Sequence, residues 1–203
     1  MTRRYIEHPE EVLQQKAIRG VMSMREKNEW LQIGKTVVVA VIVAVLFRMF
    51  IFSPIIVDGP SMEPTLQNGD QMIVNKLTYK LTEPKRFDVI VFHATEEKDY
   101  IKRIIGLPGE HIAIMHDDLY VNGELVEEDF LDKTSSYVKN QFAFTLENLV
   151  GNYPVIPKDH YLVLGDHRND STDSRTFGVI HKDEIYGKTS IIYWPPKRIR
   201  IVK

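Results

Sequence analysis

The sequence predicts a mainly β fold, in which an N-terminal transmembrane helix precedes an antiparallel β domain with a smaller inserted β lobe. A strongly apolar stretch at residues 33–52 predicts the helix. Beyond residue 54 the chain breaks into short runs rich in Val, Ile and aromatic residues, separated by Gly, Pro, Asn and Asp, which is typical of strands and turns. The segment from about 122 to 152 is more polar and less regular, and we interpret it as an insertion or small lobe.

Composition excludes several classes of function. The 203 residues are enough for one core with a smaller appended lobe. The 26 basic and 28 acidic residues leave no basic excess, so no nucleic-acid partner is expected. The absence of cysteine excludes a cysteine nucleophile, thiolate metal sites and disulfides. No paired histidines have the HExxH spacing, and we expect neither a metal nor a cofactor.

The apolar stretch is interpreted as an uncleaved membrane anchor at residues 33–53. Its centre, residues 36–47, carries no charge, and with its continuation it reaches the length of about 20 residues that a span needs. A buried core helix or strand, or a cleavable signal peptide, is an alternative. Against a signal peptide stand the long preceding segment and the lack of a small-x-small site after it. The predicted organisation is therefore an extension at 1–32, the anchor, and a folded domain at 54–203.

Basic residues predict the orientation of this anchor. On the N-terminal side of the apolar stretch or at its start lie Lys16, Arg19, Arg25, Lys27 and Lys35. After residue 53 no Lys or Arg occurs until Lys76. Because basic residues favour the cytoplasmic side, we expect a single-pass protein of the cell membrane, with a cytoplasmic N-terminus and an extracytoplasmic domain. The lipid bilayer is thus an expected partner.

Strands are predicted in order along the remaining chain. The ranges are 71–74, 88–92, 111–115, 119–121, 124–126, 160–164 and 190–194. The runs 111–115 and 119–121 flank Asp117 and Asp118, and this pattern predicts a hairpin. Asn122-Gly123 predicts the next turn.

One serine lies in an unusual loop. Ser61 is surrounded by Gly59, Pro60 and Pro64, residues that hold a chain in a fixed turn. A nucleophilic serine needs such a pose, together with a base and donors for an oxyanion. By itself, however, a serine between Pro and Met is far more often an ordinary turn residue.

Two further segments carry candidate chemistry. Lys102 lies among apolar residues, which would lower the pKa of its ammonium group and make it a general base; from about 10.4, a drop of about 3 units corresponds to roughly 4 kcal/mol. A strand lysine with its charge in solvent is the ordinary alternative. The polar segment 165–175 follows an apolar run and contains hydroxyl, carboxylate and guanidinium groups. It is either a solvated loop or a source of groups that orient Lys102, and it lacks the spacing of a calcium loop.

Five segments in order resemble those of bacterial type I signal peptidases, also called leader peptidases. They are PSMEPTL, GDQMIVNK, KRFDVIVF, YIKRIIGLPGE and GDHRNDSTDSR, all behind one apolar stretch. The short chain with a single anchor is similar to the Gram-positive form of the family. The resemblance implies a membrane-bound serine endopeptidase that removes signal peptides from secretory preproteins after a small-x-small motif.

The same resemblance implies roles for individual residues. Ser61 matches the nucleophile, Lys102 the general base and Ser171 the hydroxyl that orients the lysine. The substrate-binding positions are Val57, Gly59, Met62, Leu66, Tyr100 and Ile101. The charges expected to stabilise the structure near the site are Asp166, Arg168, Asp173 and Arg175. The sequence departs from the pattern at Gly59, where some members have a serine that stabilises the oxyanion, and at His167 and Asn169-Asp170.

Other functions remain open on the sequence alone. A Ser/Lys autoprotease like those of stress-response repressors shares the serine and lysine, but this chain shows no Ala-Gly self-cleavage site before the loop. A non-catalytic membrane-anchored binding or scaffold protein is a second alternative. In a Ser-His-Asp enzyme, His93 or His167 would be the base.

Overall fold

The computed structural model describes residues 30–46, 48, 51–95, 98–133 and 143–202. The chain divides into two compact units, residues 1–48 and 49–203. A helix covers residues 30–46, within the first unit, and its valine side chains are exposed. Among the described helices, none combines the length and apolar character needed to cross a membrane. Most of the predicted extension, residues 1–29, lies outside the described residues.

The predicted anchor and the observed strands overlap at one end. Strand β1 (Phe52–Ile56) pairs antiparallel with β2 (Gln71–Asn75), with Phe52 opposite Asn75. Residues 52 and 53 therefore belong to a sheet, where pairing with β2 satisfies their backbone polar groups, and not to the end of a helix.

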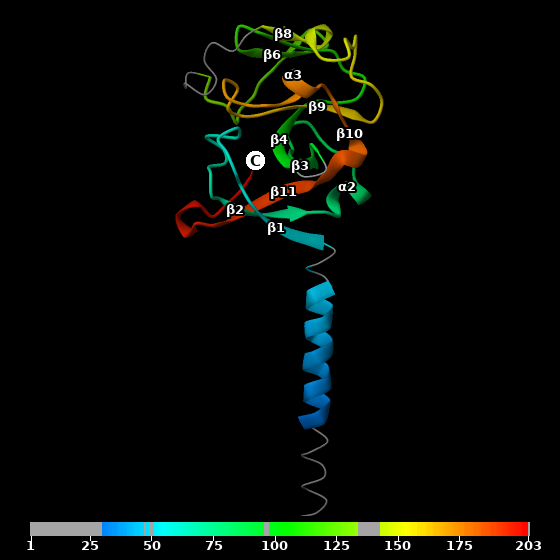
Figure 1. Cartoon of the computed structure of the whole chain (residues 1–203), viewed down its shortest axis with the longest axis vertical. Coiled ribbons are helices and arrows are strands. Elements are labelled where there is room, and N and C mark those ends of the chain that lie inside the picture. Colours follow the sequence, from blue (N-terminus) through cyan, green and yellow to red (C-terminus); the bar gives the residue numbers. More distant parts are fainter. Residues whose placement is uncertain (1–29, 47, 49–50, 96–97, 134–142, 203) are drawn as a thin grey trace, which may run out of the picture. The chain divides into compact units, whose positions relative to one another are not determined.

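The larger sheet of the second unit contains eight antiparallel strands among the described residues. Their order is β1-β2-β11-β3-β4-β9-β10, and β12 pairs with β11. The other members are β3 (Val89–His93), β4 (Asp99–Gly106), β9 (His160–Leu164), β10 (Ile180–His181), β11 (Ile185–Trp194) and β12 (Arg200–Ile201). In Figure 1, β4 and β9 lie between β1 and β2 at one end of this unit and a second sheet at the other.

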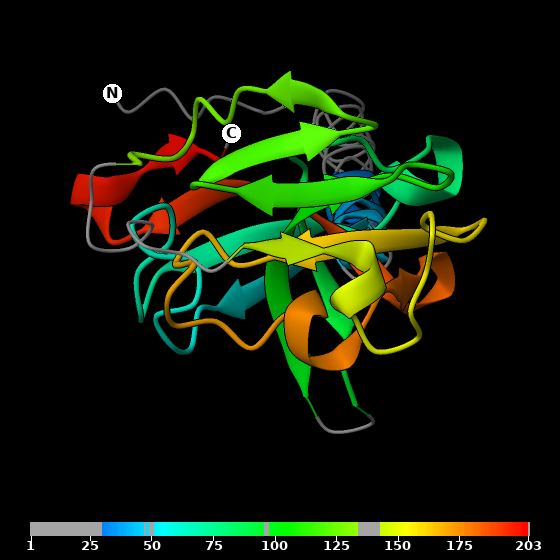
Figure 2. The ribbon, with the colours of Figure 1, turned by 90° about the horizontal axis from the view of Figure 1, so that it is seen from above.

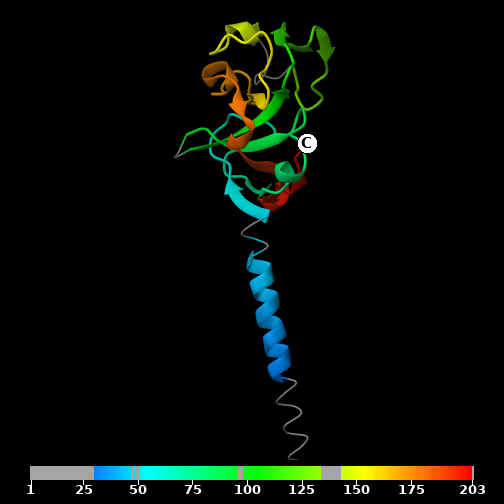
Figure 3. The ribbon, with the colours of Figure 1, turned by 90° about the vertical axis from the view of Figure 1, so that its right-hand side faces the viewer.

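The second sheet has four strands in the described part of the chain, in the order β7-β6-β5-β8. They are β5 (Ile112–Met115), β6 (Asp118–Val121), β7 (Glu124–Val126) and β8 (Phe144–Thr145). Figure 2 shows β5, β6 and β7, in green tones, side by side. Figure 3 shows the same sheet again at the end of the unit opposite β1. The sheet begins at Ile112, before the predicted boundary at 122, because the hairpin β5–β6 pairs with β7 and β8.

Short helical segments connect the strands. They are α2 (Thr78–Leu81), α3 (Ser174–Phe177) and the 3-10 turns η1 (Leu146–Asn148), η2 (Lys182–Glu184) and η3 (Pro196–Arg198). The predicted strands at 71–74, 88–92, 119–121, 124–126 and 160–164 and the hairpin at 111–121 are confirmed. No strand was predicted for β1, β4, β8, β10, β12 and the first half of β11. The antiparallel, mainly β character of the fold is therefore confirmed.

Strand β4 connects the packing of both sheets. Its successive side chains point to opposite faces of the sheet. Ile104 joins one apolar cluster with Ile90 and Val163, whereas Ile105 joins another with residues of the second sheet such as Ile114. A third cluster packs under the loop after β1. Because it is fixed by packing on both sides, β4 is a rigid support for any functional side chain that it carries.

Candidate active site

The loop that carries Ser61 begins where β1 ends. The Val57 N–H donates to Asp70 O at 2.8 Å, and the Gly69 N–H donates to Val57 O at 2.9 Å, so the two ends of the loop are tied together. Met62, 1% exposed, packs into the apolar cluster beneath the loop. Gly59 has a φ of 96°, which favours glycine. These contacts hold Ser61 at the surface of a rigid turn.

Lys102 meets this serine from β4. It lies opposite Ile90 of β3, and the residue is only 3% exposed. Its Nζ donates to Ser61 Oγ at 2.7 Å, across 41 residues of sequence. Burial lowers the pKa of Lys102 to about 8, against the opposing effect of the Asp173 and Asp166 carboxylates, with a smaller lowering from Arg175. With this pKa, roughly a tenth of Lys102 is uncharged at pH 7 and about half at pH 8.

The loop between β9 and α3 packs against both residues. Asp173 caps α3 and accepts from the Gly165 N–H at 3.0 Å. Arg175 donates to both carboxylate oxygens of Asp173, each at 2.8 Å. Burial opposes ionisation of Asp173, but these hydrogen bonds and the Arg175 charge hold the pKa of its carboxyl below the usual range.

Ser171 lies in this loop, close to the serine loop. A methyl group added at Gly165 would lie 2.2 Å from Ser171 Oγ and 2.4 Å from Ser61 O. Both oxygen atoms therefore lie close to the Gly165 backbone. The Ser171 hydroxyl helps to lower the pKa of Asp173, but it is buried and makes no hydrogen bond of ordinary geometry within the described residues. The structure records no hydrogen bond from Ser171 to Lys102.

A groove of about 490 Å³ opens onto the serine and the lysine. It is bordered by the end of β1, the loop after it, β4 and the loop after β9. Of the predicted substrate-binding positions, five line it: Val57, Gly59, Met62, Tyr100 and Ile101. Tyr100 also places its ring centre 5.2 Å from Lys102 Nζ. The apolar lining of the groove, with the serine and the lysine as polar groups, suits a peptide segment with apolar side chains.

Leu66 differs from its predicted position in the groove. It is fully buried in the apolar cluster with Met72 and Ile192, and it is not among the groove residues. Its N–H donates to Met62 O, and this helical turn directs the side chain into the core. The prediction that Leu66 contacts substrate is therefore corrected: Leu66 supports the loop from below.

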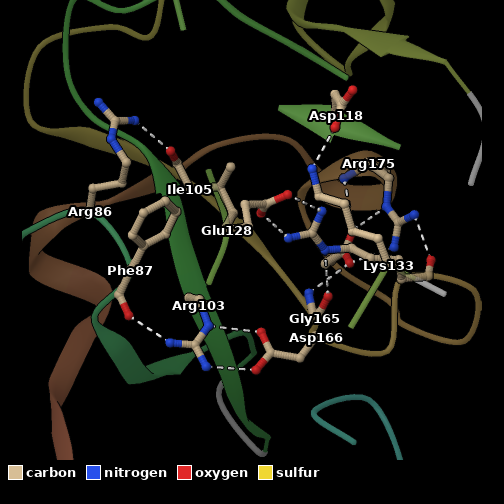
Figure 4. A network of polar contacts seen from close by, with 12 residues as sticks. Arg86, Phe87, Arg103, Ile105, Asp118, Glu128, Lys133, Gly165, Asp166 and Arg175 are labelled. Atoms are coloured by element: carbon tan, nitrogen blue, oxygen red, sulfur yellow. Dashed lines mark hydrogen bonds and ion pairs between the residues drawn. The ribbon is translucent and has the colours of Figure 1, made fainter. Parts of the chain in front are cut away.

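Two buried ion pairs surround the loop after β9, and their second partners were not predicted. Asp166 accepts two hydrogen bonds from Arg103, at 2.8 and 2.7 Å. Arg168 pairs with Glu128, and all four side chains are fully buried. Figure 4 shows Arg103 bound to Asp166. The position of Arg103 directly after Lys102 was a signal that could have identified it. Nothing in the sequence distinguished Glu128 from its exposed neighbour Glu127.

Of the two histidines considered as alternative bases, one has an acidic partner and the other contacts the Ser61 loop through its backbone. His93 is bound to Asp99 at 2.6 Å, with its side chain 54% exposed. The His167 N–H donates to Ser61 O at 3.1 Å through the backbone. The Ser61 hydroxyl accepts a hydrogen bond from Lys102.

A buried lysine bonded to a groove serine, on a rigid antiparallel β domain, is the arrangement that a Ser/Lys hydrolase requires. The family model described as signal peptidase, peptidase S26, matches residues 30–194. The chain therefore belongs to the signal peptidase family, peptidase S26, as one of its bacterial type I members.

Relatives agree with this assignment. The chain is 46% identical to "Signal peptidase I" of Bacillus caldolyticus, over 79% of this chain and 89% of the relative. It is 40% identical to "Signal peptidase IB" of Staphylococcus aureus, over 83% and 92% of the two chains. A crystal structure of a signal peptidase I from Enterococcus faecalis is 36% identical, with a TM-score of 0.46, and covers 53% of this chain and 97% of that one.

Proposed function

We propose that this serine endopeptidase removes N-terminal signal peptides from secretory preproteins, with Ser61 as nucleophile and Lys102 as general base. The hydrogen bond of 2.7 Å between Lys102 Nζ and Ser61 Oγ carries this proposal, because it joins a serine in a groove to a lysine whose pKa burial has lowered to about 8. As an ammonium, Lys102 donates to Ser61 Oγ. After losing its proton, the amine can accept the serine proton instead.

The reaction then follows as an acyl transfer. The Ser61 oxygen attacks the scissile carbonyl while its proton passes to Lys102 Nζ. Lys102 next protonates the leaving amine, and a water that gives its proton to the same lysine hydrolyses the acyl-enzyme. The Ser61 N–H has no hydrogen-bond partner among the described residues, so it is available to the oxyanion. This backbone donor would stabilise the oxyanion in an enzyme whose Gly59 has no side-chain hydroxyl to do so.

Ser171 is proposed to orient the lysine during this cycle. Its hydroxyl is buried and without a hydrogen bond of ordinary geometry in the described part of the chain, so it is free to accept or donate a bond to Lys102 when the groups move during the reaction. The Asp173–Arg175 pair and the buried Asp166 and Arg168 are proposed to hold the loop in which Ser171 lies.

The substrate is proposed to be the extended segment at the end of a signal peptide. The groove that holds Ser61 and Lys102 is lined by apolar residues that include Val57, Met62, Tyr100 and Ile101. Small side chains at two alternate positions of an extended peptide would point to the same wall. Cleavage after a small-x-small motif is therefore the proposed specificity.

We further propose that the apolar segment predicted at residues 33–53, of which residues 52 and 53 belong to β1, anchors the enzyme in the cell membrane, with residues 1–32 cytoplasmic and the domain predicted at 54–203 extracytoplasmic. The apolar run and the basic residues before it support this topology. The exposed valines of the described helix, among them Val37, Val41 and Val45, would lie against lipid. The anchor would keep Ser61 near the outer surface, because eight extended residues reach at most about 27 Å.

Mass spectrometry on a preprotein peptide with one Ala-x-Ala site tests the reaction. The full-length wild type in detergent should cut once, after the second Ala, and Ser61→Ala and Lys102→Ala should each abolish the cut. Glu127→Gln, an exposed change away from the groove, is the control that should cut normally. Cleavage by a folded Lys102→Ala variant would show that another group is the base. An intact peptide with every folded variant, wild type included, would favour a non-catalytic protein.

A further inference from the structure

A segment of the second sheet reaches the loop that carries Ser171. Residues 127–133, here called the strap, follow β7, and Glu128 within it is 3% exposed, although its neighbours Glu127 and Asp129 are exposed. Glu128 Oε1 binds Arg168 Nη2, and its Oε2 lies 3.5 Å from Arg168 Nη1. Both side chains are fully buried. A buried charge needs such a partner, so each residue depends on the other.

Arg168 links Glu128 to the groups around Lys102. Its Nε donates to Gly165 O at 3.1 Å, and its own carbonyl accepts from Arg175 Nη1 at 2.7 Å. Arg175 in turn binds both oxygens of Asp173. Figure 4 shows Glu128, Gly165 and Arg175 gathered at this point. A continuous set of hydrogen bonds thus runs from the strap to the Asp173–Arg175 pair beside the site.

The strap also covers the other buried arginine. The Phe130 ring lies 3.8 Å from the Arg103 guanidinium carbon, and Arg103 both follows Lys102 in β4 and pairs with Asp166. The strap is itself held to its sheet, since Lys133 Nζ binds Asp118 of β6 at 2.5 Å. In addition to the apolar packing of Ile105 against the second sheet, the strap therefore gives this sheet polar and aromatic contacts to β4 and to the loop after β9.

We propose that Glu128 is a positioning residue of the active site: through Arg168 it fixes the loop 165–175 against Ser61 and Lys102. This inference rests on the proposed function and assigns a task to the second sheet, which does not line the groove. Glu128 touches neither the serine nor the lysine. Loss of its charge would leave Arg168 buried without a counter-ion and release the loop.

Three variants of the full-length protein in detergent test this inference. Glu128→Gln keeps the shape and removes the charge, Glu128→Asp keeps the charge on a shorter side chain, and the exposed Glu127→Gln is the matched control. Peptide cleavage gives kcat and KM, and NMR of labelled lysine follows the titration of Lys102, whose signal is identified by its loss in Lys102→Met. Thermal unfolding verifies the folded state of each variant.

We expect kcat of Glu128→Gln to fall about 10- to 100-fold, as for a displacement of reacting groups by about 1 Å. KM should stay close to that of wild type, and the midpoint of Lys102 should rise from about 8 because water reaches the loosened site. Glu128→Asp should recover part of kcat, and Glu127→Gln should match wild type.

Wild-type kcat and an unchanged Lys102 midpoint in folded Glu128→Gln would overturn the inference. If Glu128→Gln does not fold, Glu128→Asp decides in the same way: a normal kcat and midpoint in the folded Asp variant overturn it, and a loss supports it. Failure of the wild type to cleave would instead contradict the proposed function, while the Lys102 titration would still report on positioning.

Discussion

The carbonyl oxygen of Ser61 accepts a hydrogen bond of 3.1 Å from the His167 N–H. This contact joins the loop after β1 to the loop after β9, although more than a hundred residues separate them. Gly165 lies between the two loops, where its lack of a side chain lets them approach. The position of the nucleophile therefore depends on the backbone of a distant loop.

Gly165→Ala should separate these loops. Its Cβ would lie 2.4 Å from Ser61 O and 2.2 Å from Ser171 Oγ, and the first of these is backbone that cannot rotate away. We expect kcat/KM for peptide cleavage to fall about 100-fold and unfolding free energy to fall by about 1–3 kcal/mol. Gly34→Ala, which adds a methyl group in open space, is the control. Wild-type cleavage by Gly165→Ala would contradict the close approach.

The pH dependence of cleavage should report Lys102. Because the reaction needs the neutral amine, and burial lowers its pKa to about 8, kcat/KM should be low in acid, rise through about pH 8 and then level off. Initial rates on a peptide without ionisable groups near the cleavage site measure this profile. A midpoint near the histidine value of about 6.5 would point to a histidine base.

Lys102→Met should raise stability while abolishing activity. The folded-state pKa of Lys102 is about 8 against a reference of 10.5, so the fold binds this proton less well than the unfolded chain. Below pH 8 both states are protonated and the wild type carries the full penalty, about 3 kcal/mol. The penalty shrinks as the pH rises from 8 towards 10.5. Chemical unfolding at pH 7 and pH 10 should therefore show a stabilisation by Met that is larger at pH 7; equal values at both would contradict the buried charge.

Gly59→Ser, which adds the side-chain hydroxyl that the family resemblance led us to look for at this position, should not improve the enzyme. The backbone there has a φ of 96°, which residues with a Cβ rarely adopt, while space for the atom itself is free. We expect a loss of about 1–3 kcal/mol in unfolding free energy. Gly59→Ala separates backbone strain from the added hydroxyl, since both variants share the strain. Faster cleavage by Ser than by wild type would show that the loop adapts.

Val41→Arg should weaken the proposed anchor. Val41 is an exposed member of the helix at residues 30–46, and an arginine at the centre of a span costs about 3 kcal/mol. After expression in bacteria, the variant should shift from the carbonate-resistant membrane fraction to the supernatant. Leu81→Arg, an exposed change in the second unit, controls for the added charge. An unchanged membrane fraction for Val41→Arg would contradict the anchor.

The sequence by itself determined the antiparallel β character, most strand positions and the family. Strand and turn preferences are local, so alternation at 71–74 and the turn residues around Asp117 were sufficient for β2 and the β5–β6 hairpin. The motifs around Ser61, Lys102 and Asp173 are short segments, and a resemblance in short segments is likewise visible without coordinates.

Only the tertiary structure decided how those segments meet. Three findings depend on contacts between distant segments: the 2.7 Å contact of Lys102 with Ser61, the burial of Leu66 and the pairing of Arg168 with Glu128. The spacing of these residues along the chain does not predict those contacts. Glu127 and Glu128 are identical in type and adjacent, yet one is exposed and the other fully buried against an arginine. The physical reason is that burial and ion pairing depend on which surfaces pack together, and packing is set by the whole fold.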